Sequence, residues 1–335
     1  MTNAQPLNTR IKQTIDTKTK PLGSLGKIET LAAQIARVQR TTAPVMSACT
    51  LTIFAADHGI AHAGVSAFPQ AVTGQMVMNF LTGGAAANVF AAVNGVKLQV
   101  VDAGVAGEPI SHPDLLGQRI AAGTQNFLTG PAMTTAQAQA ALDSGAEIAR
   151  MAPGEAQAFG EMGIANTATA SALTHKLTGI PLAELVGRGT GLDDAGLATK
   201  LSILTQAVER TGDLTPEQAM AEYGGFEILM IAGAMIEAAQ TGRVVIVDGF
   251  IATAAAVLAV TLAPSTRNAM VFAHQSHESG HRALLVYLDA DPLLALDMRL
   301  GEGTGALLAW PLLRAAAAMM TDMASFEAAG VSNRD

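Results

Sequence analysis

Short apolar runs alternate with long Ala-rich segments along most of this chain of 335 residues. The runs predicted as strands are Thr50–Ala55, Lys97–Val101, Ala183–Val186, Val244–Val247 and Met270–Ala273, with Ala158–Gly160 as a weaker candidate. They are largely continuous in their apolarity, which is typical of strands covered on both faces. Helices are predicted over Gln75–Ala92, Thr135–Met151, Asn166–Leu177, Gly196–Arg210, Glu227–Ala239 and Leu307–Met323. The alternation predicts an α/β fold with a parallel sheet between layers of helices.

No repeat, low-complexity tail or Pro/Ser-rich linker divides the sequence. We therefore expect one unit over residues 1–335, with a large α/β body over about 40–300 and a small helical lobe built from residues 1–39 and 305–335. Ligands of open parallel sheets bind beyond the carboxyl ends of the strands. The loops that directly follow strands are therefore the candidate sites.

The composition is apolar, with 50% hydrophobic and 14% charged residues, where an ordinary soluble domain has roughly 25% charged residues. Such a chain buries enough surface to offset the entropy of ordering, so disorder is excluded. Its most apolar stretch, residues 244–263, is interrupted by Asp248, and an aspartate costs roughly 2.5–3.5 kcal/mol at mid-membrane. We therefore expect a strand and a helix there, and a subunit contact to cover the surplus apolar surface.

The polar N-terminus, Met1–Arg10, has no signal-peptide core, and the single cysteine, Cys49, cannot form an internal disulfide. Both features suit the reducing cytoplasm. The net charge is −8, from 20 cationic and 28 anionic residues. There is thus no overall basic footprint for nucleic acid. We expect a cytoplasmic protein with neither a membrane nor a nucleic-acid partner.

Aspartates follow three of the predicted strands, in Asp57-His58-Gly59, Asp102-Ala103-Gly104 and Asp248-Gly249-Phe250. These turns would bring carboxylates to the edge of the sheet where a cleft is expected. A cap on the following helix is the alternative, and it is the favoured interpretation for Asp102. For Asp57 and Asp248 both interpretations stay open.

The segment Gly160–Thr167 has the sequence GEMGIANT and leads into a predicted helix. Its glycines permit close backbone approach, and Asn166 and Thr167 could cap the helix or donate to an anion at its N-terminus. Glu161 stands beside this anion site, where a carboxylate suits only a cationic or protonated group. The alternative is a tight turn followed by an N-cap.

A second glycine cluster, Gly187–Gly191, ends the predicted strand 183–186 and precedes a helix that contains Lys200. The spacing is G-x-G-x-G and not the G-x-G-x-x-G of dinucleotide-binding proteins, and it comes late in the chain. NAD binding is therefore the weaker interpretation.

Three histidines, His274, His277 and His281, share one face if their segment is helical. With Glu278 they could bind zinc. Gly280 interrupts the segment, so hydrogen bonding at a helix start or a subunit contact is favoured.

Glu302 lies between Gly301 and Gly303 in the segment Met298–Ala306. Such a loop exposes the carboxylate and lets a ligand lie against bare backbone. Beside an apolar ring pocket the pKa of this glutamate would rise, which makes it a better general base. The alternative is a glutamate in the first turn of a helix.

The segment Val65–Gln75 precedes a helix and could contribute to a ring pocket. Phe68 and Met76 could form its walls, and Gln75 could orient the ring by hydrogen bonding. Ordinary packing is the alternative for all three.

Taken in order, these motifs resemble the nicotinate-nucleotide–dimethylbenzimidazole phosphoribosyltransferase family of cobalamin lower-ligand assembly. The matching segments are Lys20–Gly26, Asp57–Met76, Gly160–Thr167, Tyr223–Glu227, Asp248–Phe250 and Arg299–Ala306, and they span nearly the whole chain. The segments GEMGxxNT and RLGEGTGA are the specific ones. The resemblance implies a Rossmann-like parallel sheet, a small helical lobe from both termini, and a homodimer.

The resemblance also implies transfer of phosphoribose from nicotinate mononucleotide to 5,6-dimethylbenzimidazole, giving α-ribazole 5′-phosphate and nicotinate. It makes Glu302 the general base for the azole N–H, with Glu161 assisting at the ribose or the base. The expected phosphate ligands are Gly163, Gly189 and Lys200, and the expected benzimidazole pocket is Phe68, Gln75, Met162 and Leu300. Asn166, Thr167, Gly187, Asp248, Gly249, Gly301 and Gly303, from the same loops, complete the substrate-binding set.

Two departures from the family pattern bear on substrate choice. Relatives often have GNTT where this chain has Ala165-Asn166-Thr167-Ala168, and some have a polar residue at position 68, which is Phe68 here. No metal or other cofactor is expected, because the leaving nicotinate is already cationic in the nucleotide and no diphosphate leaves. The competing hypotheses are an NAD-dependent oxidoreductase and a non-catalytic nucleotide-binding subunit.

Overall fold

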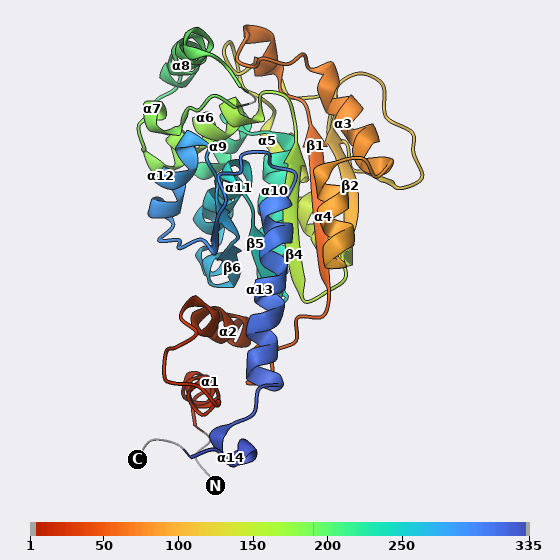
Figure 1. Cartoon of the computed structure of the whole chain (residues 1–335). Helices are drawn as coiled ribbons and strands as arrows, with labels where there is room; N and C mark the ends of the chain where they lie inside the picture. The colour runs from red at the N-terminus through yellow and green to blue at the C-terminus, as the bar shows by residue number, and fades with distance from the viewer. Residues whose placement is uncertain (1–4, 190, 333–335) are drawn as a thin grey trace.

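Six parallel strands form one sheet in the order β3-β2-β1-β4-β5-β6. The computed structural model describes residues 5–189 and 191–332 (Figure 1). The strands are β1 (Cys49–Ala56), β2 (Lys97–Gly104), β3 (Leu115–Gly117), β4 (Ala156–Met162), β5 (Val244–Val247) and β6 (Met270–Phe272). This is the Rossmann order, and its direction reverses between β1 and β4. The carboxyl ends of these two strands therefore flank the crevice where a ligand is expected.

Helices cover both faces of the sheet, because successive side chains of each strand point to opposite sides. Phe54 packs into one core cluster, whereas its neighbours Ile53 and Ala55 pack into the other. The first cluster is covered by α5 (Thr135–Met151), α6 (Asn166–Thr178), α7 (Leu182–Leu185), α8 (Asp194–Glu209), α9 (Pro216–Tyr223), α10 (Phe226–Gln240), α11 (Phe250–Leu262) and α12 (Ser279–Tyr287). The second is covered by α1 (Leu7–Asp16), α2 (Lys27–Val38), α3 (Ala71–Leu81), α4 (Ala86–Asn94) and α13 (Thr304–Thr321).

The two ends of the chain meet in a helical lobe below the sheet (Figure 1). Helix α13 crosses one face of the sheet and continues downward to α1 and α2, and α14 (Phe326–Ala329) follows it. Lys18 donates its ammonium to the Met323 carbonyl at 2.6 Å, and the Phe326 N–H donates to the Thr17 carbonyl at 3.0 Å. Since α13 belongs to both parts, the division near residues 40 and 305 stays a prediction.

Five of the six predicted strands are present, and the sixth is wrong. The sequence predicts a strand over Ala183–Val186, yet Leu182–Leu185 forms the short helix α7. Pro181 opens this segment, and Leu182 and Leu185 are buried. That is a helical spacing, which a run of four apolar residues does not reveal.

The predicted helix Gln75–Ala92 consists of two helices, α3 and α4. The chain turns between them at Gly83, whose φ of 84° favours glycine. By length and composition alone, the stretch Ala71–Asn94 could cross a membrane. The turn leaves helices of 11 and 9 residues, whereas a span needs about 20 residues.

Candidate active site

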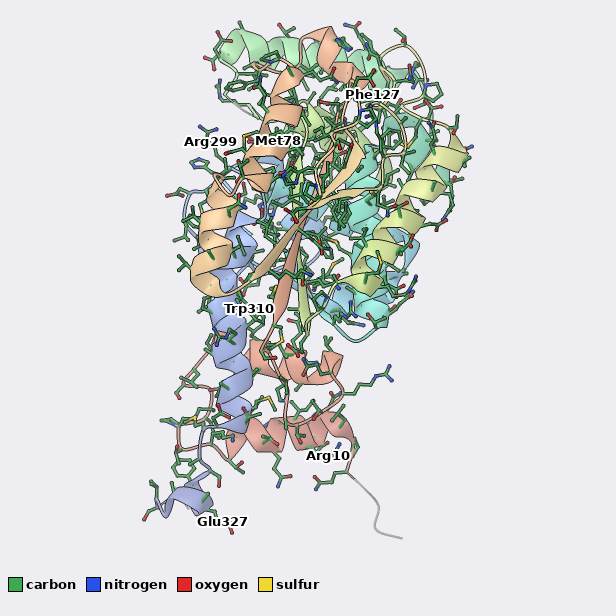
Figure 2. All side chains as sticks on the ribbon, turned by 90° about the vertical axis from the view of Figure 1, so that its right-hand side faces the viewer. Arg10, Met78, Phe127, Arg299, Trp310 and Glu327 are labelled. Carbon is green, nitrogen blue, oxygen red and sulfur yellow. The ribbon has the colours of Figure 1, made fainter. Side chains whose placement is uncertain are left out.

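A cavity of about 370 Å³ opens at the carboxyl ends of β1, β4, β5 and β6. Most of the residues predicted from the sequence line it: Phe68, Glu161, Met162, Gly163, Asn166, Thr167, Gly189, Lys200, Asp248, Gly249, Leu300, Gly301 and Glu302. The structure thus brings together loops that are more than 200 residues apart in the sequence. The site lies at the end of the sheet opposite the helical lobe. Arg299 at its rim and Glu327 in the lobe mark these two ends in Figure 2.

Three predicted residues lie outside the cavity lining. Gln75 is exposed on α3, whereas the next residue, Met76, faces the cavity. The Gly187 carbonyl accepts a hydrogen bond from Lys200 at 3.1 Å. Gly303 packs against Leu51. Direct substrate contact by Gln75, Gly187 and Gly303 stays a prediction.

Glu302 occupies a strained turn between two glycines. Its φ is 61°, and Gly301 and Gly303 have φ values of 82° and 81°, so three successive residues adopt the left-handed conformation that L side chains avoid. The side chain is only 6% exposed, and Oε2 accepts the Ala87 N–H at 3.3 Å. Burial raises the pKa of this carboxyl, as general-base chemistry near neutral pH requires.

Glu302 does not lie in the first turn of a helix, because α13 begins at Thr304. Gly160 on β4 packs directly against this turn. A Cβ atom at this position would lie 2.5 Å from the Glu302 carbonyl carbon. Only glycine therefore allows β4 and the Glu302 turn to approach so closely.

Asp248, at the end of β5, caps α13 and not the helix that follows it in sequence. Its Oδ1 accepts the Ala306 N–H at 2.9 Å, and His274 Nε2 lies 3.6 Å from the same oxygen. Burial is the main cause that raises the Asp248 pKa, and the nearby His274 acts against it. The carboxylate thus fixes the start of α13, directly after the turn that carries Glu302.

Glu161, the second predicted catalytic carboxylate, lies near the end of β4. Burial raises its pKa to about 8, with further contributions from the negative charges of Glu227 and Asp248. Asn166 donates its side-chain amide to Glu161 Oε2. At neutral pH, and before any substrate binds, Glu161 is therefore mostly protonated.

The part of the cavity around Lys200 carries the features of an anion site. Lys200 is 1% exposed and donates to Thr167 Oγ1 at 2.8 Å. Burial lowers the pKa of this ammonium to about 8. The N-terminus of α6 lies beside it, with no side-chain cap, and its partial positive charge favours an anion there. Of the two alternatives for Asn166 and Thr167, the helix cap is contradicted, because these side chains bond to Glu161 and Lys200 instead.

A phosphoribosyltransferase family model matches residues 2–331. A relative from Cupriavidus taiwanensis, named nicotinate-nucleotide–dimethylbenzimidazole phosphoribosyltransferase, is 54% identical over 326 residues, which are 96% of this chain and 94% of that protein. A relative of the same name from Dechloromonas aromatica is 52% identical, over 98% of this chain and 97% of that protein.

The chain belongs to this phosphoribosyltransferase family. The crystal structure of CobT from Thermus thermophilus has the same fold, with a TM-score of 0.95 and 44% identity, and the match covers 98% of this chain and 99% of that one. The Rossmann-like sheet expected from the resemblance is thereby confirmed.

At one departure from the family pattern, Ala165 adopts a φ of 76° just before α6. This is the left-handed region, where an alanine is strained and a glycine is not. The chain therefore carries local strain next to the anion site, as residues held at functional sites often do.

The three histidines do not share a helical face, because α12 begins only at Ser279. His277 is exposed, whereas His281 is buried and uses both ring nitrogens, with the Ser276 N–H at 2.8 Å and Thr253 Oγ1 at 2.9 Å. Burial lowers the His281 pKa to about 3, so the ring is neutral. Within residues 5–189 and 191–332, no group of three or more His, Cys, Asp or Glu side chains is arranged to hold a metal.

The context of a dinucleotide fingerprint is also missing at Gly187, because helix α7 and not a strand precedes it.

Asp102, predicted as a helix cap, instead closes the loop after β2 by accepting the Val105 N–H at 2.8 Å. Asp57 accepts from Thr73 at 2.7 Å and from the Ala106 N–H at 2.8 Å, so it ties together the loops at the edge of the site.

Sequence reasoning missed a buried pair behind the Gly163 turn. His58 Nε2 lies 2.8 Å from Glu227 Oε1, and both side chains are fully buried. A Cβ on Gly163 would come within 3.0 Å of the His58 ring. His58 follows β1 and Glu227 lies in a family-like segment, so both are visible in the sequence, but their proximity depends on the packing of α10. Glu278 and Arg188 also line the cavity, and the sequence does not predict them as site residues.

Proposed function

We propose that this cavity transfers phosphoribose from nicotinate mononucleotide to 5,6-dimethylbenzimidazole, giving α-ribazole 5′-phosphate and nicotinate. The relatives that match the chain over nearly its full length are named for this reaction. The observation that carries the assignment to this cavity is that its lining holds buried ionisable groups of both kinds, acidic and basic. The lining includes a buried carboxylate on a strained turn, Glu302, and a buried ammonium, Lys200.

The nucleotide phosphate would bind at the Lys200 end, together with the N–H groups of Gly163, Gly189 and the start of α6. Lys200 supplies the positive charge, and the backbone supplies donors at fixed positions. Holding this remote group orients C1′ of the ribose toward the carboxylates. Binding energy is thereby used to align the reacting atoms.

The acceptor ring would lie against the apolar wall formed by Val65, Phe68, Val72, Met76 and Leu300. Such a wall suits a planar methylated ring better than a charged acceptor. Glu302 would accept the azole N–H proton while the other ring nitrogen forms a bond to C1′. The bond between C1′ and the pyridinium nitrogen breaks, and its electron pair leaves with nicotinate.

Glu161 would act on the developing positive charge. The pyridinium of the nucleotide and the oxocarbenium character at C1′ both favour the ionised carboxylate, although burial raises its pKa to about 8 before substrate binds. Asp248 and Glu227 add to the negative potential there. The cavity would therefore stabilise a cation near its carboxylates and an anion near Lys200.

The test is incubation of purified protein with nicotinate mononucleotide and 5,6-dimethylbenzimidazole without added metal. Chromatography with mass spectrometry should show equal amounts of nicotinate and a benzimidazole riboside phosphate. A panel of benzimidazoles, purines and phenols would then identify the preferred acceptor. Nucleotide binding without turnover of any acceptor would favour a non-catalytic subunit, and hydride transfer with a nicotinamide cofactor would favour an oxidoreductase.

We further infer that the protein is a cytoplasmic homodimer. Apolar side chains on α3 and α4 support a subunit contact, since Met78, Val89 and Val93 are exposed, the last at 80%. Burial of such a patch is favourable at about 25 cal/mol per Å². Light scattering coupled to size-exclusion chromatography should give twice the mass of the chain, and a monomer at micromolar concentration would contradict this inference.

A further inference from the structure

A carboxylate, Glu278, lies at the anion end of the cavity. Its Oε1 accepts the Gly189 N–H at 3.1 Å. The same oxygen would lie 2.1 Å from a Cβ on Gly187, so the glycine makes room for the carboxylate. The Glu278 carboxylate thus fills the space beside Gly187, which is predicted as a substrate ligand.

The surroundings of Glu278 are those that a phosphate would need. Lys200 is near enough for the Glu278 charge to oppose the loss of its proton. Arg188 and Arg299 line the same end of the cavity, and Gly189 supplies a backbone donor. A phosphate that reached Lys200 and the Gly189 N–H would meet the Glu278 carboxylate, and two anions so close repel each other strongly.

The N-terminus of α12 offers the Glu278 carboxylate a second favourable position. Glu278 is the N-cap residue of α12, and no side chain caps this helix. The N–H groups of the first turn carry a partial positive charge that stabilises a carboxylate nearby. Rotation of the Glu278 side chain away from Gly189 would bring it toward this end of α12 without moving the backbone.

We propose that Glu278 takes the place of the substrate phosphate while the site is free of nucleotide. Its carboxylate accepts the Gly189 N–H until the nucleotide binds, and the nucleotide phosphate must displace it. The identity of the displacing group rests on the proposed function, whereas the presence of an anion site does not. Glu278 is then a specificity-determining residue. It sets the affinity for ligands that bring a phosphate and leaves nucleosides without one unaffected.

The test compares Glu278→Gln and Glu278→Ala with wild type by calorimetric titration of inorganic phosphate and nicotinate mononucleotide, at about pH 6.5, below the pKa of Lys200. Glu278→Ala should bind both ligands about tenfold more tightly, as expected if the carboxylate occupies the site for about nine-tenths of the time. Glu278→Gln should gain less, because its amide oxygen can still accept the Gly189 N–H. Nicotinate riboside, which lacks the phosphate, should bind them as it binds wild type.

Glu327→Gln is the matched control, because it removes the same charge in the lobe far from the cavity (Figure 2). It should leave both affinities unchanged. The gain in the Glu278 variants should persist at about 0.5 M NaCl, since direct competition for one N–H is screened less than a through-space effect.

Unchanged or weaker phosphate binding in Glu278→Ala, with a wild-type melting temperature, would overturn the proposal. A gain that disappears at high salt would overturn it as well. If the wild-type enzyme binds phosphate but turns over no acceptor, the proposed function fails while the anion site stands.

Discussion

The carboxylate of Asp248 accepts the backbone N–H of Ala306 at 2.9 Å, and this contact ties β5 to the start of α13. Glu302 lies immediately before that start, on a turn with three successive positive φ values. A turn of this kind persists only where its surroundings hold it. Asp248 therefore positions the proposed general base without being that base.

Asp248→Ala removes the acceptor of the Ala306 N–H and should lower kcat by about 10²-fold, because a small displacement of a catalytic group has an effect of this size. The dissociation constant of nicotinate mononucleotide should rise by less than kcat falls, since the anion end of the cavity is untouched and only the negative potential beside the pyridinium weakens. Asp102→Ala is the matched control, as Asp102 closes a loop outside the cavity lining. Steady-state kinetics and nucleotide titration would separate the two effects. A raised dissociation constant with normal kcat would contradict the positioning role.

Gly160→Ala should distort the turn that carries Glu302. Its methyl group would come within 2.5 Å of the Glu302 carbonyl carbon, so the variant should lose activity and about 1–3 kcal/mol of unfolding free energy through overpacking. Gly117→Ala on β3 is the matched control, because nothing lies within 4 Å of the added atom. Urea denaturation and turnover assays check both. Equal behaviour of the two variants would show that Gly160 is not needed for the approach of the turn.

Lys200 should make nucleotide binding depend on pH. Burial lowers its pKa to about 8, so the ammonium loses its proton as the pH rises through that value. Above it, affinity for nicotinate mononucleotide should fall by about tenfold per pH unit. Lys200→Arg keeps its charge throughout, so its affinity should rise toward pH 8 as Glu161 ionises and should not fall between about pH 8 and 10. A wild-type profile without a break near pH 8 would rule out Lys200 as the charged ligand.

Glu161 should release a proton when the nucleotide binds. Its pKa of about 8 keeps it mostly protonated at pH 7, and a pyridinium cation placed beside it favours the ionised form. Calorimetry at pH 7 in buffers of different ionisation enthalpy should show release of a sizeable fraction of one proton. The release should vanish in Glu161→Gln. No difference between the two proteins would mean that Glu161 does not face the cationic ring.

The parts of the fold that depend on local pattern are predictable from the sequence. Five strands and the glycine-rich loops after β4 and before α13 are recognisable, because apolar runs and glycine pairs are local signals. The failure at Ala183–Val186 has the same origin, since four apolar residues fit a strand and a buried helical turn equally well.

The site is predictable as a set of loops, but its pair contacts are not. That Asp248 caps α13, or that His58 meets Glu227, depends on how helices pack across more than 50 residues of sequence. Glu278 stands out in the sequence only as a neighbour of histidines. Its role near Lys200 follows from the meeting of two loops, and no spacing in the sequence encodes that.

The most direct test of the account is the turnover of Glu302→Gln. This variant keeps the size of the side chain and loses the base, so it should bind nicotinate mononucleotide as wild type does. Transfer to 5,6-dimethylbenzimidazole should fall by roughly 10²–10⁴, the usual contribution of a general base. Wild-type turnover in Glu302→Gln would contradict the assignment of Glu302 and, with it, the mechanism proposed for this cavity.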